Sequence, residues 1–393
     1  MPRSLTSIAL GIPSGSRDGR PVEGFDEDAL TLAVDVLEAL SRSTPGLPLA
    51  RIHLVGDGLE LLAEALPEAL GNLRLRTVRH PTGSGPFWAA VGAAAADPEP
   101  DGSVAVFAFE GAGPSGAGRA LRWGTCALAL GLAERPGWRV VGPGPGADPT
   151  GSIGSRQTPD APRGETGDSA ADERPWLEPL VRRFRELASP PGGPGERQDP
   201  VPGAPDSGGA TFEIEAPVAW WDVRDLPTGR DGAPTGSTPP SDDPLRHRVS
   251  EGAYLPRPTY LEHRPSRWRL AAEACPRCGT ITFPSRGVCR GCGNSGSLEA
   301  IELGRTGLVV EAVTTIRPGA QPTEFDPQVE AMGDYAVVIA RTPRGPKVTL
   351  QMASGRTPAL GDRVSARLRR LYSTEGEWRY GLKGFLERPD PGS

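Results

Sequence analysis

Hydrophobic positions over residues 1–141 alternate between two spacings. Short continuous apolar runs, typical of buried strands, occur at 6–11, 51–55, 73–78 and 104–109. Apolar residues three and four positions apart, typical of amphipathic helices, occur at 26–40 and 59–70. Strands that alternate with helices in this way predict an α/β lobe.

Two further segments complete this lobe. Pro86 precedes the small-residue run 89–96 and suits the first turn of a helix, because the N–H that proline lacks is unsatisfied there anyway. Residues 126–130 and 138–141 are apolar segments close together in the chain. They predict a closing hairpin.

Apolar and polar residues alternate with a period of two from Leu298 onward, which predicts strands with one buried face. The five segments are 308–316, 335–339, 348–352, 364–368 and 378–382. Five short strands separated by turns predict a small closed barrel, such as an OB-fold, over 298–388.

The middle of the chain is rich in glycine, proline, serine, threonine and aspartate, and has too little apolar surface to offset the entropy of ordering it. We therefore predict a disordered linker over 142–210, interrupted by a short amphipathic helix at 176–187. Residues 211–251 predict a strand segment that must pack on another part of the protein, followed by more linker. A helical lead-in is expected at 252–274.

The 393-residue chain is long enough for two or three domains. Its net charge of -6 and pI near 5.5 provide no overall positive field for nucleic acid or anionic lipid. The N-terminal apolar run is too short for a secretory signal, and no run approaches the ~18 apolar residues of a membrane span. We therefore expect a soluble cytoplasmic protein that has no membrane partner.

Four of the five cysteines form two CxxC pairs, Cys275 with Cys278 and Cys289 with Cys292. Each pair lets two thiolates converge from one tight turn, which fits metal binding in a reducing compartment better than a set of disulfides. Four thiolates favour a closed tetrahedral zinc site, and a single iron of the rubredoxin type is the alternative. Because a catalytic zinc site keeps one position open, we expect a structural zinc ribbon over 275–297.

The residues around these cysteines resemble a known family. Tyr260-Leu-Glu-His-Arg264, Ser266-Arg-Trp-Arg-Leu270 and the ribbon sequence CPRCGTITFPSRGVCRGCG are similar to the zinc-ribbon plus OB-fold family that is associated with thiolases and HMG-CoA synthase. The likeness covers about 252–388. It implies a rubredoxin-like ribbon, an all-β OB-fold, and a non-catalytic scaffold that partners an acyl-CoA enzyme of the thiolase or HMG-CoA synthase type.

Alternation in the last two predicted strands also predicts a basic face on the barrel. Its members are Arg363, Arg367, Arg369, Arg379 and Lys383. Guanidinium groups match phosphate geometry, so this face is a candidate site for the phosphates of an acyl-CoA ligand. Two alternatives stay open, a nucleic-acid backbone and an ordinary solvated face. The acidic chain and the few exposed aromatics disfavour nucleic acid.

The pattern over about residues 6–130 resembles the first half of a thiolase-fold synthase. In that family a nucleophilic cysteine begins the helix that corresponds to the one near Ser84, where the helix N-terminus lowers the thiol pKa. This chain reads Thr82-Gly-Ser84 there, and linkers replace the half that carries the family's catalytic histidine. We therefore predict a degenerate, partial thiolase-like lobe with no catalytic residue. An acyltransferase built on this lobe is the enzymatic alternative.

Overall fold

The computed structural model describes residues 4–11, 15–17, 20–22, 26–43, 46–56, 59–82, 84–97, 102–110, 126–133, 138–143, 210–214, 219–222, 255–317, 334–353, 357–374 and 377–387. The helix predicted at 176–187 and most of the linker predicted at 142–210 lie outside these residues. Within the described part of the chain, no helix is long and apolar enough to cross a membrane.

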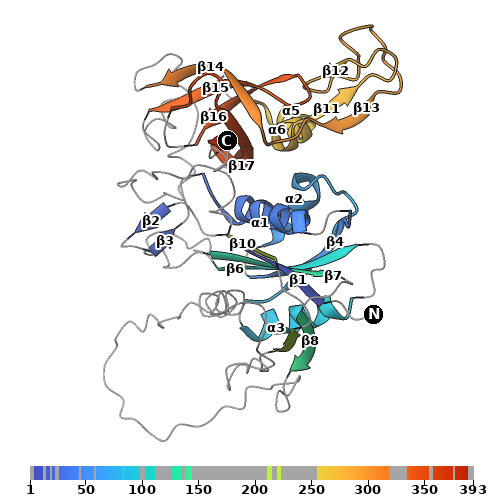
Figure 1. Ribbon diagram of the computed structural model, residues 1–393, viewed down its shortest axis with the longest axis vertical. Helices are drawn as coiled ribbons and strands as arrows, with labels where there is room; N and C mark the ends of the chain where they lie inside the picture. Colours follow the sequence, from blue (N-terminus) through green and yellow to red (C-terminus); the bar gives the residue numbers. More distant parts are fainter. Residues whose placement is uncertain are drawn as a thin grey trace, which may run out of the picture.

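The N-terminal lobe is built on one mixed sheet of eight strands (Figure 1). The strands lie in the order β5-β4-β6-β7-β1-β8-β9, and β10 pairs in parallel with β1. Their bounds are β1 Ser4–Gly11, β4 Leu49–Val55, β5 Arg76–His80, β6 Ser103–Glu110, β7 Cys126–Ala133, β8 Trp138–Pro143, β9 Ala210–Ile214 and β10 Ala219–Asp222. A separate hairpin joins β2 Gly15–Arg17 to β3 Arg20–Val22.

The hairpin predicted from residues 126–130 and 138–141 is wrong, because β1 lies between β7 and β8. β1 pairs antiparallel with β7 along most of its length and with β8 at Ser4 and Leu5. An apolar strand buried in a sheet needs hydrogen-bonding partners on both edges, and the apolar pattern does not say which strands these are. The β9 and β10 segments, which needed a surface to pack on, join this same sheet.

Helices cover both faces of the sheet (Figure 1). The helices α1 Ala29–Ser43 and α2 Glu60–Ala69 lie on one face, and α3 Ser84–Ala95 lies on the other. Asp28 begins α1, since its Oδ1 accepts a hydrogen bond from the N–H of Thr31 at 3.0 Å and its own N–H donates to the Thr31 hydroxyl at 2.9 Å. The α/β pattern predicted for this lobe is therefore observed.

The C-terminal module contains two short helices, a small sheet and a barrel (Figure 1). The helices are α5 Arg257–Glu262 and α6 Arg264–Arg269, and the sheet has the order β12-β11-β13, with β11 Ala271–Ala274, β12 Ile281–Thr282 and β13 Glu299–Glu302. The closed barrel has the order β14-β15-β16-β18-β17, with β14 Leu308–Ile316, β15 Tyr335–Arg341, β16 Lys347–Met352, β17 Arg363–Thr374 and β18 Glu377–Leu386. The five predicted strands and the closed barrel are confirmed.

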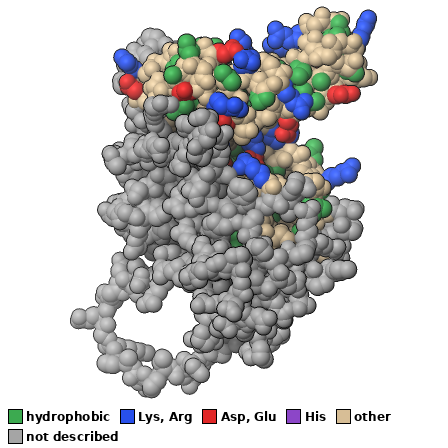
Figure 2. Space-filling view, viewed as in Figure 1, with side chains coloured by type: hydrophobic (Ala, Val, Ile, Leu, Met, Phe, Trp, Pro, Cys, Tyr) green, Lys and Arg blue, Asp and Glu red, His purple; other side chains and the backbone are tan. Residues whose placement is uncertain are grey.

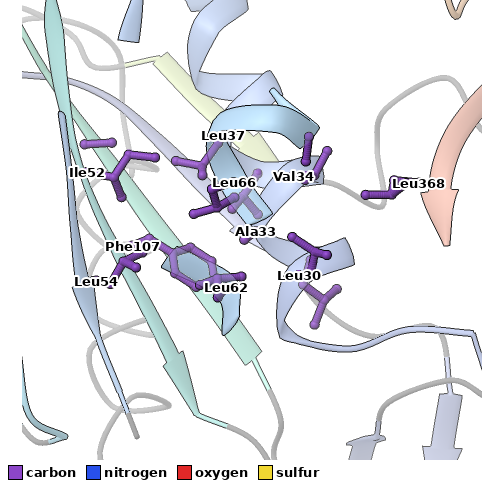
Figure 3. Packing of buried hydrophobic residues seen from close by; sticks show 14 of the residues in the cluster. Leu30, Ala33, Val34, Leu37, Ile52, Leu54, Leu62, Leu66, Phe107 and Leu368 are labelled. Carbon is purple, nitrogen blue, oxygen red and sulfur yellow. The ribbon is translucent and has the colours of Figure 1, made fainter. Parts of the chain in front are cut away.

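The layer of α1 and α2 lies between the sheet and the barrel, and it joins the two modules into one core (Figures 1 and 3). Leu30 and Val34 of α1 belong to the same buried cluster as Phe107 of the sheet and Leu368 of β17. Trp268 of α6 also belongs to it. Since apolar burial contributes about 25 cal/mol per Å², a shared core of this kind holds the barrel firmly on the lobe.

Candidate metal centre and lobe interface

The four cysteines of the CxxC pairs converge on one point. Their sulfur atoms all lie within 4.8 Å of one another. The Sγ atoms of Cys275 and Cys292 are 3.7 Å apart, and those of Cys278 and Cys289 are 3.5 Å apart. Sulfurs bound tetrahedrally at ~2.3 Å from one zinc ion would be about 3.8 Å apart, so the spacing fits a metal ion held by four thiolates.

Two matching turns hold the sulfurs in place. The N–H of Gly279 donates to the Cys275 carbonyl at 2.8 Å, and the N–H of Gly293 donates to the Cys289 carbonyl at 2.9 Å. Both glycines have φ near +70°, at 72° and 73°. Residues that carry a side chain rarely adopt this left-handed backbone conformation, which explains why a glycine follows each CxxC pair. The N–H of Gly291 also donates to the Cys289 sulfur at 3.3 Å.

The thiols differ in how readily they lose a proton. The Thr280 hydroxyl lies 3.2 Å from the Cys278 sulfur, and its hydrogen bond, with that of the Thr280 N–H, lowers the pKa of Cys278 to about 6. The Asn294 N–H lowers the pKa of Cys292, but the three neighbouring thiols and burial outweigh it and raise that pKa to about 11. Four thiolates at this spacing would repel one another unless a cation lay between them. The cluster therefore suits a divalent metal ion.

The four cysteines lie beside the small three-stranded sheet and outside the shared core. Cys275 directly follows β11, and Cys275 and Cys289 are buried while Cys278 and Cys292 are exposed. Four protein ligands complete a tetrahedral shell and leave no position for a substrate. The arrangement therefore has the chemistry of a structural brace.

The predicted basic face of the barrel is largely covered by the N-terminal lobe. From Val364 to Arg370, β17 is buried: Val364 and Ala366 belong to the barrel core, and Leu368 belongs to the core shared with α1. Among the five predicted residues, Arg367, Arg369, Arg379 and Lys383 are buried, and only Arg363 is exposed, at 69% for its side chain. Strand alternation placed these side chains on one face correctly, but it did not show that acidic helix α1 covers that face.

Carboxylates just before α1 and in the middle of it pair with these cations. Arg369, at 1% exposure, lies 2.9 Å from the Asp35 carboxylate and 3.9 Å from that of Glu27. The Lys383 ammonium donates to Asp26 at 2.9 Å. Burial alone would raise the pKa of Asp26, but Lys383 and then Arg369 hold it below its ordinary value. The interface is therefore a buried network of ion pairs.

Aromatic residues extend the same interface. The Tyr380 hydroxyl donates to the Asp28 carboxylate at 2.6 Å, so the residue that begins α1 is also bound by the barrel. The Tyr380 N–H donates to the Tyr260 hydroxyl at 2.9 Å, and Trp268 donates to that hydroxyl at 3.0 Å. Arg379 lies over the Tyr260 ring at 5.0 Å and pairs with Glu377 at 2.8 Å. All five basic residues of the predicted face lie beside protein carboxylates. Phosphate binding by these residues therefore stays a prediction.

No family model matches the chain. Two archaeal proteins, each a DUF35 domain-containing scaffold protein, are similar to part of it. The protein from Methanothermobacter thermautotrophicus is 29% identical over 129 residues, which are 32% of this chain and 91% of that protein. The protein from Methanocaldococcus jannaschii is 29% identical over 125 residues, which are 31% of this chain and 84% of that protein.

Several solved structures resemble about a third of the chain, and three of them are described next. The Ltp2-ChsH2(DUF35) aldolase has a TM-score of 0.25 at 17% identity and matches 34% of this chain and 98% of that one. HMG-CoA synthase complexed with CoA has a TM-score of 0.29 at 15% identity, over 35% of this chain and 43% of that one. The ChlB3 acyltransferase has a TM-score of 0.29 at 18% identity, over 36% and 53%.

The residue pattern did not reveal a histidine pair in the N-terminal lobe, in which His53 is buried and His80 is half-buried. The Nδ1 atom of His53 on β4 lies 3.0 Å from the Nε2 atom of His80 at the end of β5, and Nε2 of His53 lies 4.0 Å from the Asp97 carboxylate. The two histidines are 27 positions apart and become neighbours because β4 and β5 pair in parallel. Burial, followed by the neighbouring His80 ring, lowers the pKa of His53 to about 4.

This pair predicts that acid weakens the fold. The unfolded chain protonates His53 near its ordinary pKa of 6.5, whereas the folded chain resists protonation down to about 4. The unfolded state therefore binds more protons in this window, and the free energy of unfolding should fall by roughly 2–3 kcal/mol as the pH drops from 6.5 to 4. Urea unfolding at several pH values measures this slope. The slope should be smaller in His53→Gln than in His263→Gln. Equal slopes in the two variants would show that His53 does not cause the pH dependence.

Proposed function

We propose that this chain is a non-catalytic scaffold protein whose ribbon and barrel bind an enzyme of the thiolase or HMG-CoA synthase type. The observation that carries the proposal is the similarity to two DUF35 scaffold proteins, which extends over most of the length of each. The closed sulfur site supports a bracing role, because it offers no open coordination position for chemistry.

We further propose that the metal is zinc and that the barrel is an OB-fold. Four thiolates with near-tetrahedral spacing suit zinc, which needs no redox partner. The barrel has five strands, and β16 pairs in parallel with β18 while the other pairs are antiparallel. A small five-stranded barrel of mixed pairing supports the OB-fold assignment.

The N-terminal lobe is proposed to act as a partner within the same chain. The matched region makes up 91% of the Methanothermobacter protein but only 32% of this chain, in which an α/β lobe packs on β17 and hydrogen-bonds to Tyr380 and Lys383 of β18. We propose that this lobe is a degenerate thiolase-like unit. It would occupy one face of the barrel permanently and leave the ribbon and the other barrel strands for an external enzyme.

Binding of an external enzyme can be tested with exposed apolar residues. Val288 on the ribbon, Leu360 beside the barrel and Leu61 on α2 are 46%, 70% and 78% exposed. A thiolase or HMG-CoA synthase from the same genome should co-elute with the full chain in size-exclusion chromatography. Val288→Glu or Leu360→Glu should weaken the complex at least tenfold, because each places a charge on the binding module.

Leu61→Glu is the matched control, since it adds the same charge to the other lobe. It should leave the affinity within twofold of the unaltered chain. The proposal is wrong if none of the candidate enzymes binds, or if only Leu61→Glu weakens the complex. The chain alone should show no thiolase or synthase turnover.

Acyl-CoA binding is the finer part of the proposal. Arg363 is the exposed member of the predicted basic face, so a CoA phosphate can reach it without separating the lobes. Calorimetry with acetyl-CoA, on the full chain and on Arg363→Glu, tests this contact directly. Equal affinities would remove Arg363 from any such site.

A further inference from the structure

A cavity of about 620 Å³ lies at the seam between the two modules. Its lobe side includes Arg42 and Leu75, and its barrel side includes Arg305, Ser365 and Arg367. Figure 2 shows basic and acidic side chains meeting along this border between the barrel and the lobe. The volume falls within the range of roughly 300–1,000 Å³ that is typical of small-molecule sites.

The charges that line the cavity do not cancel. Three arginines, Arg42, Arg305 and Arg367, face two carboxylates. Arg305 pairs with Glu38, and Arg367 lies 3.6 Å from Asp35. Arg42 makes no ion pair with any other residue in the described part of the chain. The cavity therefore has one cation in excess, at the end of α1.

A buried hydroxyl also lacks a partner in the cavity wall. Ser365 is 4% exposed, and its Oγ atom makes no hydrogen bond within the described residues. A buried polar atom without a partner destabilises the fold, and a ligand that hydrogen-bonds to Ser365 would remove this cost. Burial also lowers the pKa of Arg305 to about 10, so a nearby anion would stabilise its charge.

The rest of the wall combines polar residues, Ser41, Asn72 and Thr306, with an apolar patch. Leu47, Leu49, Leu70 and Leu75 line the cavity on the lobe side. We propose that the cavity binds a small organic anion, with a carboxylate or phosphate group near Arg42 and Ser365 and a short apolar group against the leucines. This site is separate from the metal centre and does not depend on the proposed scaffold function.

Such a ligand would link the two modules, because the cavity wall comes from both of them. A ligand that binds only the docked arrangement stabilises that arrangement by mass action. The anion would therefore act as a bridge between α1 and β17, and its presence should raise the melting temperature of the full chain.

Calorimetry on the full chain with four probes tests the proposal. The probes are hexanoate, hexyl phosphate, hexylamine and hexanol, which share the apolar group and differ in the polar one. At least one anionic probe should bind ten times more tightly than hexylamine or hexanol. A comparison of hexanoate with hexyl phosphate then assigns the preferred anion.

Two arginine variants control for non-specific attraction. Arg42→Ala should lower the affinity for the anionic probe at least tenfold. Arg344→Ala, which removes an exposed arginine in the β15–β16 turn, should change that affinity less than twofold. Ser365→Ala should also lower the affinity for the anionic probe and leave the circular dichroism spectrum unchanged. Equal binding of all four probes, or equal affinity in Arg42→Ala and Arg344→Ala, would overturn the proposal.

Discussion

Replacing Arg369 by methionine should lower the free energy of unfolding of the full chain by about 3–5 kcal/mol. The guanidinium is 1% exposed and lies between Asp35, at 2.9 Å, and Glu27, at 3.9 Å. Without it, two carboxylates stay buried with too little positive charge beside them. Urea unfolding followed by tryptophan fluorescence measures the loss.

Arg363→Met is the control on the same strand, because its side chain is 69% exposed and pairs with Glu387 at 3.6 Å. A surface ion pair of this kind contributes at most about 1 kcal/mol. The double variant Arg369→Met with Asp35→Asn should recover part of the loss, since it also removes one of the uncompensated charges. Equal losses in Arg369→Met and Arg363→Met would show that the network does not hold the lobes together.

Changing Cys289 to serine should abolish stoichiometric metal binding. Purified chain should contain one zinc ion per molecule by elemental analysis, and Cys289→Ser should contain much less, because Cys289 is a buried member of the four-sulfur cluster. Structural zinc sites contribute about 10–16 kcal/mol to the folding of small metal-binding peptides. The ribbon should therefore unfold without its metal.

Trypsin detects that local unfolding. Arg277, Arg286 and Arg290 lie in the ribbon, and their peptide bonds should be cut at least tenfold faster in Cys289→Ser than in the unaltered chain. Cys126→Ser serves as the control, since Cys126 lies on β7, in the other lobe. A chain without metal that resists trypsin as well as the unaltered chain would contradict the bracing role.

The sequence alone determined the features that depend on local chemistry. Two CxxC pairs with a glycine after each specified the sulfur cluster, because each turn is built from neighbouring residues. Period-two spacing located the five barrel strands and helical spacing located α1 and α2, since each pattern reports which side of one element is buried.

Tertiary structure decided which elements are neighbours. The sequence placed Arg367, Arg369 and Lys383 on one face, but only the fold set that face against Asp26 and Asp35, more than 300 positions away in the chain. The His53–His80 pair and the position of β1 between β7 and β8 arise in the same way. Burial patterns show that a surface is covered, and long-range packing of the whole chain selects what covers it.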